Sequence, residues 1–208
     1  MGAANLTTHL PILQVLEKAG TTPYTSTQPE AAGQAFQSGV PVQLNSSGYV
    51  QQWDGTTVTA GILGVSESFG LNLASAGLGA PTPPFGGITG SIAIQSYGQV
   101  PNQPNAANIA IGTPVSDGRT LYIEPDQANI FQALFDNSNG TAAADWTPTQ
   151  ADIGKKYGLT ADSTWGYWYV DKNKTSGNAV VQIVGLPNGS GLNYPVNFVF
   201  LTSAVQIA

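Results

Sequence analysis

Residues 40–65 alternate short apolar runs with residues that favour tight turns, and this pattern restricts the possible folds more than any other segment does. A strand over 40–44, the turn residues Ser46-Ser47-Gly48 and a returning strand over 49–53 have the pattern of a β-hairpin. A further strand is predicted over 58–65. The segment therefore predicts an antiparallel sheet built from short strands.

Composition extends this prediction to the whole chain. Of its 208 residues, 9% are charged, whereas 25 are glycine and 14 are proline; an average globular domain has about 25% charged residues. Thr, Ser, Asn and Gln suit solvent-facing strand positions and turns, so we expect an all-β fold with few short helices. A surface with so few charges lacks the usual protection against association, and its neutral areas are expected to be contact surfaces.

The chain divides at its loops into three predicted parts. Residues 1–30 are predicted to form an N-terminal arm with a short helix, since Pro11 suits a first helical turn. Such a helix is marginal alone, so the arm must dock on its own domain or on a partner subunit. The remainder is expected to form two β-rich domains, over 31–100 and 101–208. The apolar residues that would share one face of the helix are Ile12, Leu13 and Leu16.

Charge and hydropathy argue against two classes of partner. The net charge is −6 with only six basic residues, so the chain lacks the clustered Lys and Arg that phosphate neutralisation requires. No segment approaches the roughly 18 apolar residues needed to span a membrane, and the N-terminus lacks the basic region of a signal peptide. We therefore expect no nucleic acid, no membrane, and a protein that stays inside the cell where it is made.

Residues able to carry catalysis are sparse. His9 is the only histidine and cysteine is absent, so neither a nucleophile–base pair nor the usual zinc ligands are expected. A carboxylate pair of the glycosidase type could come from Asp117, Glu124 and Asp126, but their places in a turn and at a strand end favour turn formation. The loop after Asp171 lacks the central glycine and final glutamate of a calcium loop. We expect no enzyme activity, no metal and no cofactor.

An aromatic strand is predicted over residues 165–170. Alternation would place Trp165, Tyr167 and Tyr169 on one face and Trp168 on the other. Aromatic platforms stack on sugars, but aromatic residues are also enriched in cores and at subunit contacts. The three aromatics are therefore candidates for either a glycan contact or a subunit contact.

Two motifs resemble a known family. The sequence Trp53-Asp54-Gly55-Thr56-Thr57, followed by Gly61-Ile62-Leu63, is similar to the core of tailed-phage head decoration (capsid cement) proteins over residues 30–68. The segment 151–159 is similar to modules of phage head-associated proteins. The resemblance implies a β-tulip or barrel-like domain, homotrimers on the capsid exterior, and an N-terminal arm that adds a strand to the major capsid protein. This chain departs from the compact members in its added C-terminal half and its predicted helix.

The leading expectation is thus a virion structural protein, made in the host cytoplasm, that binds and stabilises the outside of the assembled phage capsid. The alternative is a glycan-binding or tail-associated display module of the virion. The residues expected to contact the capsid or a partner are Leu10, Ile12, Leu13, Leu16, Tyr24 and Trp53.

Overall fold

The chain folds almost entirely into β-strands. The structure is a computed structural model that describes residues 11–17, 25–31, 34, 36, 38–67, 115–126, 129–162 and 166–206. Helical residues in this part are confined to three short 3-10 turns, all on the C-terminal half. The predicted all-β fold is therefore confirmed. The 3-10 turns are η3 (Ala143–Trp146), η4 (Gln150–Asp152) and η5 (Ser176–Asn178).

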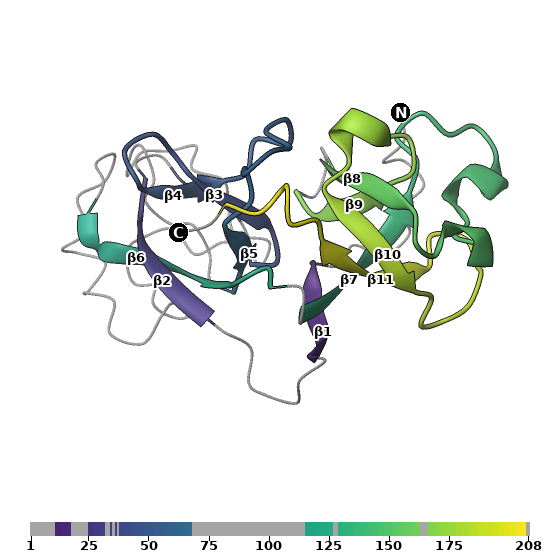
Figure 1. Cartoon of the computed structure of the whole chain (residues 1–208), viewed down its shortest axis with the longest axis horizontal. Coiled ribbons are helices and arrows are strands. Elements are labelled where there is room, and N and C mark those ends of the chain that lie inside the picture. The colour runs from purple at the N-terminus through teal and green to yellow at the C-terminus, as the bar shows by residue number, and fades with distance from the viewer. Residues whose placement is uncertain are drawn as a thin grey trace, which may run out of the picture.

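Five strands close a first barrel with the order β2-β4-β3-β5-β6 (Figure 1). The predicted hairpin is confirmed as β3 and β4, which pair antiparallel from Val42 opposite Gln52 to Leu44 opposite Val50. Gly48 allows the connecting turn because its φ is +79°, a conformation that costs glycine little. The strands are β2 (Thr25–Glu30), β3 (Pro41–Leu44), β4 (Val50–Gln52), β5 (Gly64–Ser66) and β6 (Val115–Ile123).

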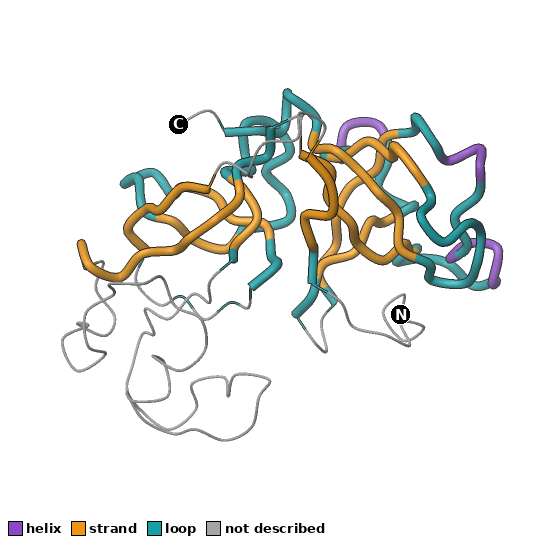
Figure 2. Tube along the Cα trace, turned by 90° about the horizontal axis from the view of Figure 1, so that it is seen from below, coloured by secondary structure: helices purple, strands orange, loops and turns teal. Residues whose placement is uncertain are grey.

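Five later strands close a second barrel with the order β7-β11-β10-β8-β9. A further strand, β1 (Leu13–Glu17), pairs antiparallel with β7 beside this barrel. Figure 2 shows the strands gathered into two groups joined by loops. The strands of the second barrel are β7 (Asn129–Asp136), β8 (Lys156–Ala161), β9 (Trp168–Asp171), β10 (Val181–Gly185) and β11 (Pro195–Phe200).

The two barrels share one strand order and one register. In each, the first and third strands pair in parallel and complete the ring, whereas all other neighbours are antiparallel. Before each second strand, a glycine with positive φ donates its N–H to the fourth strand: Gly39 to the Ser66 carbonyl at 2.7 Å, and Gly154 to the Ile183 carbonyl at 2.8 Å. Each fourth-strand residue donates back to the carbonyl of the residue after the glycine. The second barrel thus repeats the first along the chain.

Segments near both ends of the chain cross between the barrels. While β1 lies against β7, residues 201–206 leave β11 and dock on the first barrel, as the yellow segment in Figure 1 shows. There the N–H groups of Ala60 and Gly61 donate to the carbonyls of Ser203 and Ala204 at 2.8 and 2.9 Å. One hydrophobic core contains side chains from both barrels. The barrels are therefore packed against each other and connected by the two crossing segments.

The prediction of a helix in the arm is wrong over the described residues. Leu13–Glu17 forms β1, because the edge of β7 offers main-chain partners that an isolated short helix lacks. The strand pairing also differs from the predicted domain ranges. β2, placed in the arm, and β6, placed in the second domain, are neighbours in the first barrel. The predicted boundary at residue 100 lies outside the described residues.

Candidate functional site at the junction of the barrels

The segment that begins the described chain bridges the two barrels. The Ile12 N–H donates to the Gly39 carbonyl of the first barrel at 2.9 Å, and the Ile12 side chain is buried. The next residue, Leu13, starts β1 and pairs with Gln132 of β7, yet its side chain is 45% exposed. No second strand pairs with β1 in the part of the chain that the structure describes. The outer edge of β1 there presents main-chain groups and an apolar side chain together.

A groove of about 270 Å³ opens beside the start of β1. It lies between the bridging segment and the ends of β5 and β6, and among its described lining residues only Glu67 is acidic. A mixed surface of this kind can hold an apolar side chain of an extended segment, and it brings together no carboxylate pair for acid–base catalysis. The lining residues are Pro11, Ile12, Leu13, Ser38, Gly39, Val65, Ser66, Glu67 and Ile123.

The motif that begins at Trp53 builds the inside of this junction. The Trp53 side chain is buried, its ring centroid lies 5.1 Å from that of Trp168, and its Nε1–H donates to the Thr57 carbonyl at 2.9 Å. Asp54 accepts hydrogen bonds from the N–H groups of Thr56 and Thr57, both at 2.8 Å. Burial would raise the pKa of Asp54, but these bonds and one from the Thr57 hydroxyl outweigh it and lower the pKa to about 2. The motif is thus a rigid turn that joins the barrels.

The predicted contact residues fall in different environments. Ile12 and Trp53 are buried, so neither offers a surface, whereas Leu13 is exposed. Leu10 and Tyr24 lie outside the described residues, as does the side chain of Leu16. The structure therefore brings Leu13 to a surface and assigns Ile12 and Trp53 to packing.

Tyr169 and Trp168 point to opposite faces of the strand, as alternation predicts, but both are buried. Tyr169 is 2% exposed, and burial together with nearby carboxylates raises the pKa of its hydroxyl. Trp168 is also buried although it faces the opposite side, and Tyr167 is half-buried. Trp165 lies outside the described residues. A buried Tyr169 cannot stack on a glycan, because no part of its ring reaches solvent.

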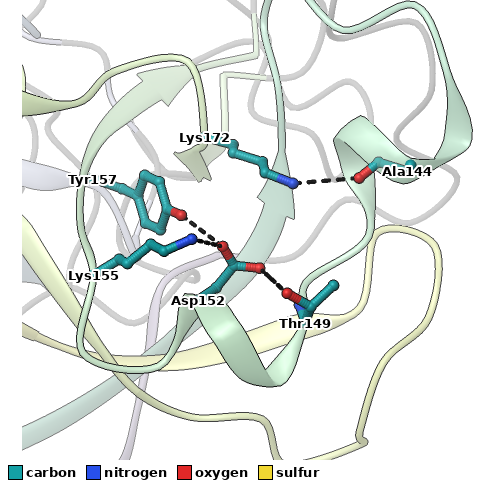
Figure 3. A network of polar contacts seen from close by, with 6 residues as sticks. All are labelled: Ala144, Thr149, Asp152, Lys155, Tyr157 and Lys172. Carbon is teal, nitrogen blue, oxygen red and sulfur yellow. Dashed lines mark hydrogen bonds and ion pairs between the residues drawn. The ribbon is translucent and has the colours of Figure 1, made fainter.

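A polar network fixes the conformation of the segment 151–159 (Figure 3). Buried Asp152 accepts hydrogen bonds from the Tyr157 hydroxyl at 2.6 Å and from the Thr149 N–H and hydroxyl, both at 2.8 Å. Burial would raise the pKa of Asp152, but the bonds from Tyr157 and Thr149 outweigh it and lower the pKa. Lys155 adds an ion pair at 3.4 Å. With each oxygen occupied, Asp152 holds the entry of β8 in place and is not available as a catalytic base.

Of the remaining candidate catalytic residues, the structure describes the side chains of Glu124 and Asp126. Glu124 accepts a hydrogen bond from the Ser26 hydroxyl at 2.8 Å, and Asp126 is exposed on the turn before β7. Neither His9 nor the Asp117 side chain is described. In the described ranges, no three His, Cys, Asp or Glu residues could hold a metal ion, and no helix is long and apolar enough to cross a membrane.

Sequence reasoning missed the groove and the docked C-terminal segment. The groove joins residues 11–13 to residues near 38 and 66, and only the left-handed Gly39 marks this close approach locally. Residues 201–206 carry no turn or strand signal strong enough to identify a docking segment. No known family, curated protein or solved structure matches the chain. The interpretation of the junction therefore depends on its geometry and on the motifs that lie within it.

Proposed function

We propose that the protein is a phage virion structural protein that binds the outside of the assembled capsid and stabilises it, as a head decoration or cement protein. The observation that carries this proposal is the edge strand β1, which lies at the junction of the two connected barrels. It begins with the exposed Leu13 and lies beside a groove. An extended segment gains main-chain hydrogen bonds when it adds to such an edge. In this proposal the partner is the major capsid protein, and the chain acts as a homotrimer.

The two joined barrels support a structural role. A cement protein must resist deformation across its whole length, and here both crossing segments and a shared core connect the barrels. The resemblance of Trp53-Asp54-Gly55-Thr56-Thr57 to decoration proteins falls on a turn that supports this connection. A glycan-binding display module is the weaker proposal, because Tyr169 is buried.

Co-sedimentation with capsid shells of the same phage, in expanded and unexpanded forms, tests the proposal. We expect saturable binding of the whole chain to expanded shells, from which the number of copies per capsid follows. Absence of binding to both forms would overturn the decoration role. A deletion of residues 1–30 is unsuitable for this test, because it would remove β2 from a closed barrel.

A pair of point variants tests the site itself. Leu13→Asp places a charge on the edge of β1 and is expected to weaken shell binding at least tenfold, since a buried unpaired charge is costly. Val184→Asp is the matched control, because Val184 is a 37% exposed apolar residue on β10 of the second barrel. Equal binding by both variants would leave decoration in place but remove β1 as the contact surface.

A further inference from the structure

Three carboxylates are buried on the outer side of the second barrel wall. In β7, Phe131, Ala133 and Phe135 belong to the main core, so Asp136 must point to the opposite side of the strand. Tyr169 in β9 lies outside the main core as well, and Asp171 follows it on the same side. The parallel pairing of β7 with β9 sets Asp136 opposite Asp171. The exposed fractions of Asp136, Asp162 and Asp171 are 0%, 1% and 0%.

Two of these carboxylates have unequal hydrogen bonding. Asp171 accepts from the N–H groups of Ser138 and Asn173, both at 3.0 Å, and from the Thr160 hydroxyl at 2.7 Å. Asp136 Oδ1 accepts from the Asn137 N–H at 2.7 Å, whereas the buried Oδ2 has no hydrogen-bond partner. A buried carboxylate oxygen without a donor disfavours the ionised form. Asp162 Oδ2 is likewise buried without a hydrogen-bond partner, but of the two acids that face each other across the closing pair, Asp136 is the better suited to hold a proton.

The first barrel shows that closure does not require these acids. Its parallel closing pair is Glu30 opposite Val50, so the positions equivalent to Asp136 and Asp171 are Ala31 and Gln51. There the Ala31 N–H donates to the Val50 carbonyl at 2.7 Å, and the buried carboxylate of the closing pair, Glu30, accepts a hydrogen bond from the Thr120 hydroxyl at 3.0 Å. Closure of the first barrel therefore does not require two facing acids. Because buried charges are weak contributors to stability, the acids of the second barrel call for another explanation.

We propose that Asp136 is a proton-operated latch, which takes up a proton in mild acid and then fastens the segment 137–142 to the wall of the second barrel. The protonated carboxyl of Asp136 gains an O–H donor for the carboxylates beside it, and the repulsion among the three acids falls. When Asp136 ionises, its carboxylate is again repelled by those of Asp171 and Asp162. This repulsion acts directly below the start of the segment, where Asp136 accepts the Asn137 N–H and Asp171 accepts the Ser138 N–H.

The other groups around the cluster offset this charge only in part, since Lys174 attracts Asp171 but forms no ion pair with it among the described contacts. Tyr169 remains neutral because its pKa is raised. Lys172 donates to the Ala144 carbonyl, and Lys174 donates to the Leu159 carbonyl at 2.8 Å. Neither lysine forms an ion pair with Asp136 among the described contacts. The cluster therefore keeps an excess of negative charge when Asp136 is ionised.

The direction of the pH effect follows from the environment of Asp136. Burial raises its pKa from 3.8 to about 6; the Asn137 N–H opposes this, and Asp171 and Asp162 add to it. The folded state thus holds this proton more tightly than the unfolded state. The resulting stabilisation is complete below pH 3.8 and is lost as pH rises through about 6. This group alone should lower the folding equilibrium constant about sixtyfold between pH 4 and pH 7.

Carboxyl ¹³C NMR titration of the whole wild-type chain is the direct test. We expect one buried aspartate, assigned by its loss in Asp136→Asn, to titrate near pH 6. Amide hydrogen exchange, corrected for intrinsic rates, should show at least tenfold more protection of Ser138, whose N–H donates to Asp171, at pH 5 than at pH 7. The barrel amide of Val180, which donates to the Tyr157 carbonyl, serves as the reference for global opening.

Denaturation of variants completes the test. Asp136→Asn should abolish the loss of stability between pH 4.5 and pH 7, while the exposed control Asp126→Asn should retain it. A titration of Asp136 below pH 4.5, or a pH response shared by Ser138 and the Val180 reference, would overturn the latch. Because the titration and exchange use the wild type, the proposal stays testable even if Asp136→Asn fails to fold.

Discussion

The first and second barrels have the same connectivity but differ in what lies outside their strands. The connection between the fourth and fifth strands covers residues 67–114 in the first barrel and residues 186–194 in the second. Conversely, the connection between the first and second strands is short in the first barrel, residues 31–40, and carries two 3-10 turns in the second, residues 137–155. Strand pairing thus defines the common barrel, and the connections carry what is particular to each copy.

Equivalent positions show the same division between shared and particular features. Leu44 and Leu159 occupy the same place in the second strand of each barrel, and both pack in the common core. At the next step around the barrel, Gln51 corresponds to Asp171, where the second barrel has its buried acids. The Leu44 and Leu159 pair thus preserves apolar character inside, while the Gln51 and Asp171 pair differs on the outer wall. The inside is not uniformly preserved, because the buried Glu30 stands where the second barrel has Phe135.

Replacing Trp53 with alanine tests whether the barrels form one cooperative unit. Trp53→Ala removes a buried ring, its contact with Trp168 and its hydrogen bond to Thr57, so we expect a loss of about 3–5 kcal/mol in the free energy of unfolding. Chemical denaturation followed by far-ultraviolet circular dichroism measures it. Trp146→Ala, at a half-buried tryptophan on η3, should cost less. Destabilisation of only the first barrel, seen as two separate transitions, would show that the barrels are independent.

Local pairing was predictable from the sequence. The hairpin of β3 and β4 was predicted because strand, turn and strand follow one another, and Gly48 marks the turn. Strand β1 was not predicted, because it forms by pairing with β7, which lies more than a hundred residues away in the sequence. Closure of each barrel likewise depends on a parallel pair between non-consecutive strands, and alternation within one strand cannot specify such a partner.

The candidate site was predictable only in part. Leu13 was predicted to be a contact residue and is exposed, but the arm was assigned the wrong secondary structure. The aromatic alternation around Tyr169 did not identify an exposed face, because both faces of β9 are buried: Trp168 lies in the main core, and Tyr169 packs with Leu134 of β7. The acid cluster could not be found at all, since Asp136 and Asp171 meet only through barrel closure.

The paired glycines sharpen the comparison of the barrels. Gly39 and Gly154 have φ values of +77° and +86°, so alanine at either position incurs the left-handed penalty of about 1 kcal/mol. A Cβ at Gly154 would meet no atom within 4 Å, whereas one at Gly39 would overlap the Cβ of Pro11. We expect Gly39→Ala to destabilise the protein by about 1–2 kcal/mol more than Gly154→Ala. Equal losses in urea denaturation would show that the bridging segment at Pro11 yields easily.

The smallest expected effect concerns a polar anchor that only the second barrel has. Tyr157 corresponds to Val42 in the first barrel, and its hydroxyl donates to Asp152. Tyr157→Phe removes this bond and should cost about 1 kcal/mol at pH 7. Because the bond helps to lower the pKa of Asp152 below 3.8, its stabilisation is present above pH 3.8 and is lost as pH falls through the lowered value. Urea denaturation at pH 7 and pH 3 should therefore show that Tyr157→Phe loses less unfolding free energy on acidification than wild type does.

Tyr167→Phe, at a half-buried tyrosine in the loop before β9, is the control and should lose as much unfolding free energy on acidification as wild type. If Tyr157→Phe instead loses as much unfolding free energy on acidification as wild type, then Thr149 and Lys155 hold Asp152 without the tyrosine.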